Sequence, residues 1–333
     1  MTVLWKKGNM DMDKQLNKRS LTYKHIKEPT TEILGYINDR RHGVVKSLKT
    51  KWPKFNKQCM GGIEPNVIYT IAGISGSGKS SFVNSLETDL FDLNPKADFI
   101  VLSFSFEMLS SRQVGRKISY KMQKTTSELY GGGLDYYKGL SDKDYYQVKE
   151  HADKISKYPI YYVDSPGTVE EIGNTIEIFQ EKIKGTNKSL IVILDHALLT
   201  RSGSNGSERE ALYELQKLFI EKKKIGKTTI IQVSQMNRNI ESKERITNPS
   251  MHFPLRSDLF GSDSLFQSSD YVIVLHRPET LYIEKYGPKH EPVLNKIYMH
   301  FLKVREGEPK TLKFDNNLKY NSIDEPSEFN LKS

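Results

Sequence analysis

The feature that most constrains the fold is a series of short, almost uninterrupted apolar segments, separated by stretches in which apolar residues recur at helical spacing. The five clearest segments span residues 67–73, 99–106, 159–164, 190–195 and 228–235. Such segments are typical of parallel strands that are covered on both faces. Residues 270–279 provide a sixth, and residues 296–307 alternate as a strand with one wetter face. The sequence therefore predicts an α/β fold: a doubly wound, mostly parallel sheet with helices on both faces.

Size and composition limit the class of protein. With 333 residues, 37% of them apolar, the chain can bury a full core. No run approaches the roughly 18 apolar residues that cross a bilayer, and no apolar stretch follows the basic residues at the N-terminus. We therefore predict a soluble, cytoplasmic protein with no membrane partner. Cys59 is the single cysteine, which excludes an internal disulfide and a cysteine-based zinc cage.

The chain is basic, with 50 Lys and Arg against 41 Asp and Glu, a formal charge of +9. This excess favours a polyanionic partner, although a solvated basic surface explains it equally well. Near the N-terminus, Ile33, Leu34 and Ile37 follow helical spacing and a glycine comes after them. This amphipathic helix needs an apolar groove, on its own domain or on a neighbouring subunit. The predicted divisions are a flexible basic leader (1–28), this helical segment (29–45), a main domain (46–323) and a tail (324–333).

Residues 73–81, GISGSGKSS, match the pattern G-x-x-x-x-G-K-[ST] and lie between a predicted strand and a predicted helix. The glycines let backbone N–H groups surround phosphates, and the helix N-terminus adds a favourable dipole. Lys79 can reach the β- and γ-phosphate oxygens, and Ser80 can hold Mg²⁺. The predicted cofactors are therefore ATP and Mg²⁺. The predicted nucleotide-binding residues here are Gly73, Ser75, Gly76, Ser77, Gly78, Lys79, Ser80 and Ser81.

Three polar residues follow the ends of other predicted strands. Asp195 is a candidate Mg²⁺ carboxylate, with a helix-cap or loop aspartate as the alternative. Glu107 could act as a general base toward water, or could simply lie in the first turn of a helix that begins there. Gln235 could contact the γ-phosphate, or be an ordinary polar strand terminus. Together with Lys79 they follow four parallel strands, at the edge where such sheets bind ligands.

Lys303 and Arg305 are two residues apart on the predicted strand 296–307, so both side chains are expected on one face. A buried pair of cations would be costly, so that face is either solvated or meets anions. The second possibility makes the pair candidate fingers that complete the phosphate site of a neighbour.

Other segments point less clearly to function. Residues 201–210 and 238–264 are rich in Gly, Ser, Asn and Pro, and we predict mobile working loops there. We interpret His196 as a strand-end residue without metal ligation. Several tyrosines alternate with lysines and could stack on bases, although packing within two short helices is favoured. These residues are Tyr136, Tyr137, Tyr145 and Tyr146.

The order of these motifs resembles that of the hexameric replicative DNA helicases of the DnaB-like type, which occur in bacteria and their phages and carry a RecA-like ATPase domain. The similarity covers residues 30–323. GISGSGKSS resembles the first motif of that family, LIVILDHALL the second and VSQMNR the third with its glutamine. SFSFEM, with Arg116 nine residues after Glu107, is similar to the Ser-Leu-Glu-Met segment, and KVREG to the Lys-x-Arg finger.

The resemblance implies a ring of identical subunits that threads single-stranded DNA and holds ATP at each interface. Residues 29–45 would be the linker helix that docks on the adjacent subunit. Lys303 and Arg305 would act on the γ-phosphate of the neighbour, and Arg116 would contribute to nucleotide binding. The residues acting within one subunit would be Lys79, Ser80, Glu107, Asp195 and Gln235, with Ser80 and Asp195 holding Mg²⁺.

The chain departs from the family pattern in two places. Fewer than 30 residues precede the helical segment, whereas the family carries a helical N-terminal domain that engages primase and forms a collar. The resemblance thus implies a short form, with a primase or helicase loader as a further partner. Residues 257–270 resemble the Ser-Asp-Leu-Arg-Glu-Ser-Gly DNA loop of the family, but Phe260 and Gly261 replace its arginine and glutamate. Arg256 or Phe260 could compensate by charge or stacking.

The leading hypothesis is an ATP-dependent DNA helicase, encoded by a phage or plasmid, that translocates as a hexameric ring on one strand. A RecA-like ring or filament ATPase that binds nucleic acid without unwinding, such as a recombination mediator or loader, is the alternative. A P-loop kinase is a third possibility, but no lid or acceptor pocket is evident in the sequence.

Overall fold

The computed structural model describes residues 22–132, 139–197, 200 and 207–326. The chain divides into two units, residues 1–46 and 47–333. In the first unit, the predicted helix is longer at its start than expected: α2 spans Lys27–Arg41. None of its residues is buried, and the side chains of Ile33, Leu34 and Ile37 are each more than half exposed. The apolar stripe predicted from the sequence is therefore available to a partner.

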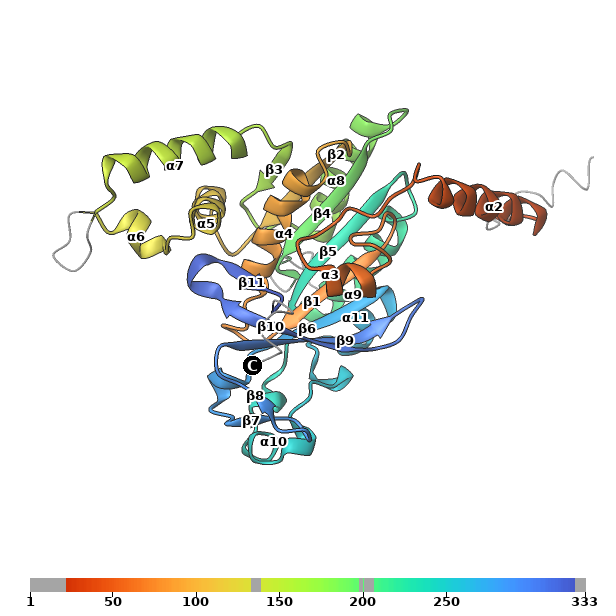
Figure 1. Ribbon diagram of the computed structural model, residues 1–333. Helices are drawn as coiled ribbons and strands as arrows, with labels where there is room; N and C mark the ends of the chain where they lie inside the picture. Colours follow the sequence, from red (N-terminus) through yellow and green to blue (C-terminus); the bar gives the residue numbers. More distant parts are fainter. Residues whose placement is uncertain (1–21, 133–138, 198–199, 201–206, 327–333) are drawn as a thin grey trace, which may run out of the picture. The chain divides into compact units, whose positions relative to one another are not determined.

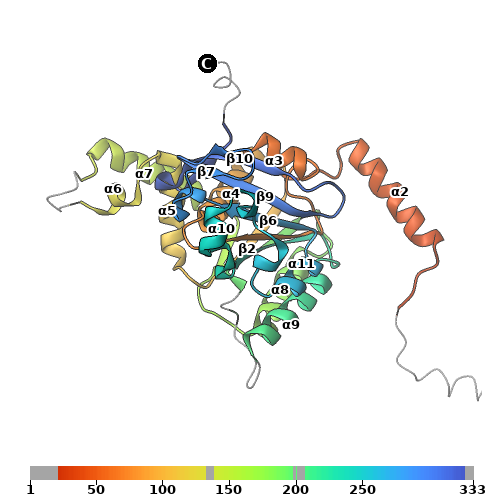
Figure 2. The same ribbon diagram turned by 90° about the horizontal axis from the view of Figure 1, so that it is seen from below.

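The second unit is built on one nine-stranded sheet with the order β11-β10-β9-β6-β1-β5-β4-β2-β3 (Figures 1 and 2). The strands from β6 to β3 in that order are parallel, and β9, β10 and β11 add antiparallel ribbons at one side. The predicted doubly wound, mostly parallel sheet is confirmed. The strands are β1 (Ile68–Gly73), β2 (Phe99–Ser105), β3 (Ile160–Val163), β4 (Ser189–Asp195), β5 (Thr228–Gln235), β6 (Tyr271–His276), β9 (Lys296–Val304), β10 (Thr311–Asn317) and β11 (Ser322–Asp324).

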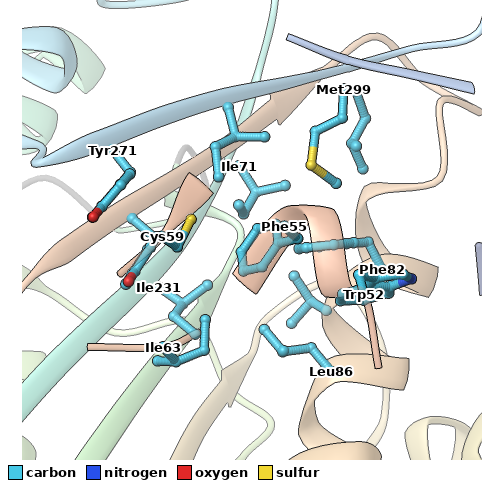
Figure 3. Close-up of a cluster of buried hydrophobic side chains, with 14 of the residues drawn as sticks. Trp52, Phe55, Cys59, Ile63, Ile71, Phe82, Leu86, Ile231, Tyr271 and Met299 are labelled. Atoms are coloured by element: carbon cyan, nitrogen blue, oxygen red, sulfur yellow. The ribbon is translucent and has the colours of Figure 1, made fainter. Parts of the chain in front are cut away.

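Helices cover both faces of the sheet. Alternate residues of the strands enter two separate cores, because successive side chains of a strand point to opposite faces. On one face, Trp52 and Phe55 at α3 pack with Phe82 and Leu86 of α4 (Figure 3). The other core joins the sheet to α8, α9 and α11. The helices of this unit are α3 (Pro53–Gln58), α4 (Lys79–Leu93), α5 (Ser110–Met122), α6 (Thr126–Tyr130), α7 (Asp142–Ile155), α8 (Val169–Ile183), α9 (Glu208–Lys222), α10 (Lys243–Thr247) and α11 (Ser262–Ser268).

Residues 324 and 325, just past the predicted end of the main domain, make contacts with α3 and the segment before it. Asp324 ends β11 and forms an ion pair with Lys51 at 2.9 Å. The Glu325 carboxylate accepts hydrogen bonds from the backbone N–H groups of Lys54 and Phe55, at the start of α3. The sequence does not indicate β10 or β11, because β10 places only two apolar side chains, Leu312 and Phe314, toward a core.

The two stretches predicted to be irregular are more ordered than expected where they are described. Residues 238–258 contain three 3₁₀ turns and α10, and α11 begins at Ser262. A capping box at Ser207 starts α9 inside the stretch 201–210, while residues 201–206 lie outside the described part of the chain. A two-stranded ribbon, β7 (Lys285–Tyr286) and β8 (Glu291–Pro292), lies between β6 and β9 in sequence. None of the described helices has the length and apolar character needed to span a membrane.

Candidate active site

The strand order brings the predicted phosphate-loop residues, Glu107, Asp195 and Gln235 to one edge of the sheet. In β1 and β5, Gly73 is in register with Gln235, and in β2 and β4, Ser105 is in register with Asp195. Because β5 and β4 are also neighbours, the four strand ends lie side by side. The segment 73–80, the residue Glu107, Asp195 and Gln235 therefore share the carboxyl edge, where parallel sheets bind ligands.

The loop between β1 and α4 requires its glycines. Gly76 and Gly78 have φ values of 74° and 98°, which L-residues with side chains rarely adopt. A Cβ on Gly73 would lie 2.3 Å from Ser77 Oγ and 2.5 Å from the carbonyl oxygen of Leu275. The loop consequently turns tightly before the N-terminus of α4, the geometry that presents backbone N–H groups to phosphate.

Lys79, the first residue of α4, is folded over the loop. Its Nζ donates hydrogen bonds to the carbonyl oxygens of Gly73 and Ile74, each at 2.8 Å. Burial lowers the pKa of this ammonium, while Asp195 and Glu107 act in the opposite direction. The two carbonyl oxygens are neutral, so the Lys79 ammonium can leave them for a phosphate, whose negative charge compensates its own.

Asp195 ends β4 beside this lysine, and its side chain is hydrogen-bonded to Ser80. Burial raises the pKa of the Asp195 carboxyl to about 6, and Glu107 also raises it, against Ser80, Lys79 and Arg116. Among the described residues, Asp195 Oδ1 is buried without a hydrogen-bond partner. A buried carboxylate oxygen with a free lone pair next to a hydroxyl fits Mg²⁺, which takes few protein ligands and completes its shell with water and phosphate.

Glu107 does not lie in a helix, so the first-turn interpretation of this residue is wrong. It occupies the bend after β2, and α5 begins three residues later at Ser110. Ser110 is tied to Asp164, whose two carboxylate oxygens accept from its N–H and hydroxyl. The exposed Glu107 carboxylate lies close enough to Asp195, Lys79 and Arg116 to affect the pKa of all three.

A buried ion pair holds α5, which carries Arg116, against α4. The neighbouring Lys117 contacts Glu87 of α4, and both side chains are at most 3% exposed. Ser103 of β2 donates to the other oxygen of Glu87 at 2.7 Å. Burial lowers the pKa of Arg116, and Asp195 and Glu107 act to raise it. The ion pair thus fixes the position of α5 against α4, and it keeps Arg116 near the carboxylates of Asp195 and Glu107.

His196 belongs to this site, although its sequence position next to Asp195 suggests only a strand end. The side chain is 7% exposed, its Nε2 lies 3.4 Å from Nε2 of Gln235, and its Nδ1 has no partner among the described residues. Burial lowers the pKa of the imidazole. No cluster of three or more His, Cys, Asp or Glu side chains suited to a metal occurs in the described ranges.

The end of β5 is joined to the segment that resembles a DNA loop. The N–H of Phe260 donates to the carbonyl oxygen of Gln235 at 3.2 Å, and the N–H of Asn237 donates to that of Asp258 at 2.7 Å. Gly261 has a φ of 63°, and a Cβ there would lie 2.3 Å from Leu212 of α9. This close approach to α9 explains why a glycine stands at this position.

Lys303 and Arg305 lie at the opposite edge of the sheet. Arg305 follows β9 in a turn, so the prediction that it lies in the same strand as Lys303 is wrong by one residue. Its N–H donates to the carbonyl oxygen of Asp270, directly before β6. Lys303 Nζ donates to the carbonyl oxygen of Phe266 at 2.6 Å, and burial lowers the pKa of this lysine. Since β1 runs from this edge to Gly73, roughly 17 Å separate the two ends.

The tyrosine-rich segment does not pack as predicted. Tyr145 and Tyr146 are on α7 with side chains 52% and 70% exposed. Both rings lie within 6 Å of Nζ of Lys149, at 4.8 Å and 5.8 Å. Tyr136 and Tyr137 lie outside the described residues.

This chain is similar to known proteins over the part that contains the site. The family of DnaB-like helicase C-terminal domains matches residues 47–325. The replicative DNA helicase DnaB of Mycobacterium leprae is 29% identical over 213 residues, which cover 63% of this chain and 31% of that protein. The DnaB of Leifsonia xyli is 24% identical over 295 residues, 87% of this chain and 59% of that protein. The chain thus spans about a third to three fifths of the length of these two relatives.

Two solved structures share the fold. One is the structure of an ATPase domain, which superimposes with a TM-score of 0.76 at 19% identity, covering 92% of this chain and 100% of that one. A DnaB-like replicative helicase, whose structure was described with its interactions with primase, gives a TM-score of 0.73 at 18% identity, covering 95% and 70%. The matched residues run from before α3 to one residue past β11 and so include both edges of the sheet. The chain therefore belongs to the family of DnaB-like helicase C-terminal domains.

Proposed function

We propose that this protein is an ATP-dependent DNA helicase whose subunits assemble head to tail into a hexameric ring and translocate along single-stranded DNA. One observation carries the proposal. The phosphate loop with Asp195 and Gln235 lies at one edge of the sheet, and Arg305 lies at the other, at the level of the first residue of β1. An arginine side chain cannot bridge that separation, which supports the proposal that the nucleotide served by Arg305 is bound to another subunit.

Within one subunit, each residue has a distinct task. Backbone N–H groups of residues 75–80 would surround the β- and γ-phosphates, and Lys79 would leave its two carbonyl partners to neutralise them. Glu107, exposed and outside the helix, can accept a proton from the attacking water. Gln235 can contact the γ-phosphate, and its side-chain amide lies next to the His196 imidazole. Arg116 adds positive charge beside the site.

Ser80 and Asp195 are the residues that would hold Mg²⁺. The cation, when bound with ATP, stabilises negative charge on the transferring phosphoryl group. The unpaired Oδ1 of Asp195 and its neighbour Ser80 supply oxygen ligands of the type that Mg²⁺ prefers.

Contacts between subunits would come from two places. Lys303 and Arg305 would complete the phosphate site of the neighbour, and the exposed stripe of α2 would dock on the adjacent subunit. Both contacts pair unlike surfaces, as the interfaces of a ring do.

The DNA contacts would come from residues 257–266. Their backbone N–H groups can bind phosphates, and Arg256 and Phe260 can add charge and stacking. Because Phe260 is hydrogen-bonded to Gln235, a change at the γ-phosphate has a direct route to this loop. Primase or a helicase loader is the further partner that we propose, and the bacterial or phage host cytoplasm is the proposed location.

The test is strand displacement on a forked DNA substrate in the presence of ATP and Mg²⁺. Wild type is expected to unwind the fork and to assemble with an ATP analogue and single-stranded DNA. Lys79→Ala should abolish turnover and unwinding. Arg305→Ala should lose about 10³-fold in turnover and bind nucleotide almost normally, as removal of an arginine finger does. Turnover without unwinding would identify a non-unwinding ring or filament ATPase instead, and normal turnover in Arg305→Ala would disprove its action on the neighbour.

A further inference from the structure

Asp270, directly before β6, is a buried carboxylate at the end of the segment 257–270, and the sequence motifs give it no role. Its side chain is only 5% exposed. One oxygen, Oδ2, accepts hydrogen bonds from the N–H of Ile68 at 2.8 Å and from Nζ of Lys223 at 2.6 Å. The other, Oδ1, lies 2.6 Å from Nε of Arg305 in an ion pair. A carboxylate buried this deeply is costly unless charges compensate it, and here two cations do so.

The same residue holds the backbone of Arg305. The N–H of Arg305 donates to the carbonyl oxygen of Asp270, and the N–H of Asp270 donates to that of Ile68, each at 2.9 Å. Arg305 stands in a turn after β9, and the two residues that follow it, Glu306 and Gly307, are exposed. Asp270 therefore ties both the main chain and the side chain of Arg305 to the start of β1.

The Arg305 guanidinium can nevertheless contact groups outside its own subunit. Its side chain is 53% exposed, whereas Asp270 and Lys223 beneath it are 5% and 14% exposed. The ion pair is made through Nε, the guanidinium nitrogen closest to the chain, so the terminal nitrogens lie beyond the contact. Lys303 has a separate anchor at the carbonyl oxygens of Phe266 and Gln267. Of Lys303 and Arg305, only Arg305 forms an ion pair with Asp270 among the contacts of the described residues, while the other carboxylate oxygen accepts from Lys223.

We infer that Asp270 is a positioning residue, which presents the Arg305 guanidinium in a fixed orientation to the γ-phosphate bound by the neighbouring subunit. This inference rests on the proposed action of Arg305 between subunits. An arginine with several free torsions loses entropy when it engages a phosphate, and an anchored one has lost much of it already. The carboxylate also balances one of two adjacent cations, Lys223 and Arg305, which would otherwise repel each other.

The experiment is a double-mutant cycle on the full chain, assembled with single-stranded DNA at saturating ATP. Asp270→Asn is expected to lower kcat about 10- to 100-fold, the usual effect of misplacing a catalytic group by about 1 Å. The KM for ATP should change less than about threefold, because the neighbour supplies the nucleotide site. The double variant Asp270→Asn/Arg305→Ala should be no slower than Arg305→Ala alone. An Asp270→Asn effect that persists undiminished in the Arg305→Ala background would overturn the inference.

Asp98 provides a control for the loss of a carboxylate at this edge, with a side chain that is 55% exposed. It directly precedes β2 at the same edge of the sheet and pairs with Lys188 at 2.6 Å. Asp98→Asn is expected to leave kcat unchanged; a loss equal to that of Asp270→Asn would show a general effect of charge at this edge and contradict the inference.

A second variant covers the case in which Asp270→Asn does not fold. Asp270→Asn/Lys223→Met also removes the lysine that would be left unpaired, and the same loss of kcat is expected. Wild-type kcat in that variant would disprove the positioning role. Failure of the underlying proposal looks different, because Arg305→Ala would then itself keep normal turnover.

Discussion

Two opposing effects act on the Asp195 carboxyl: burial favours its neutral form, and the neighbouring cations favour its ionised form. The carboxyl lies next to Lys79 and Arg116, yet desolvation outweighs both cations and raises its pKa. A metal ion would reverse this balance, because it binds the ionised form. Asp195 therefore lowers the stability of the ligand-free fold and increases its affinity for the metal and the nucleotide.

This conflict predicts a pH-dependent effect of Asp195→Asn. The pKa of Asp195 is raised from 3.8 to about 6, so the native state retains a proton that the unfolded chain releases in this window. Native stability is therefore lost as pH rises from about 4 to about 6, by roughly 3 kcal/mol for a shift of this size. In urea unfolding with EDTA, Asp195→Asn should gain about that much over wild type at pH 7.5 relative to pH 4. An equal difference at the two pH values would contradict the assignment.

Phe260 and Gly261 mark two different kinds of departure from the family pattern. Phe260 is 37% exposed, whereas a Cβ on Gly261 would lie 2.3 Å from Leu212. An arginine at position 260 can therefore extend toward solvent, whereas a glutamate at position 261 would clash with α9.

We expect Phe260→Arg to fold normally and to bind single-stranded DNA more tightly. Its log-log salt dependence should steepen by about 0.7, the value for one added phosphate contact on a single strand. Gly261→Glu should destabilise the fold by roughly 1–3 kcal/mol because of its backbone conformation and the contact with α9. Fluorescence anisotropy and urea titration measure the two effects; unchanged DNA affinity in Phe260→Arg would place residue 260 away from DNA.

At the scale of elements, α2 is a helix without a buried face in its own unit. It has no buried residue, although its apolar side chains follow helical spacing. Short helices of this length are marginal in water unless an apolar face is covered. A second subunit is the cover that we propose.

Replacing Ile33, Leu34 and Ile37 by Ser should therefore prevent assembly. Each side chain would forgo about 1.5 kcal/mol or more of apolar burial in the interface. Mass measurement with an ATP analogue and single-stranded DNA should show a shift to monomers. The control is Ile178→Ser on α8, whose side chain is 66% exposed and outside the proposed contact. Normal assembly of the triple variant would show that α2 docks elsewhere.

Elements differed in how far the sequence could predict them. The apolar runs of β1, β2, β4 and β5 act through burial on both faces, and the local pattern predicts their bounds within one or two residues. The start of α5 could not be found in this way, because Ser110 is held by Asp164, 54 residues away. The strand ends placed Glu107, Asp195 and Gln235 at one edge, while His196 and Asp270 become visible only through contacts across the sheet.

At the scale of the whole molecule, the sheet separates the two halves of the proposed catalytic site. Each subunit would offer its phosphate loop at one edge and Arg305 at the other. A complete site would then need two subunits, and each half could be inactivated independently.

Mixing two inactive variants should restore activity. In an equimolar mixture of Lys79→Ala and Arg305→Ala, an intact loop meets an intact Arg305 wherever an Arg305→Ala subunit is followed by a Lys79→Ala subunit. With random assembly into rings, this holds for about one half times one half, or roughly a quarter, of the interfaces. ATP turnover measured after mixing should rise well above that of either variant. No recovery at all would indicate that loop and arginine act within the same subunit.

The opposite placement of phosphate loop and Arg305 also determines what an unclosed assembly can do. In the proposed assembly, an open arc of subunits would end with one phosphate loop that has no neighbouring arginine and, at its other end, one arginine that has no neighbouring loop. Closing the ring would join these two ends into one further active interface, so the last step of assembly would add a catalytic site without adding a subunit.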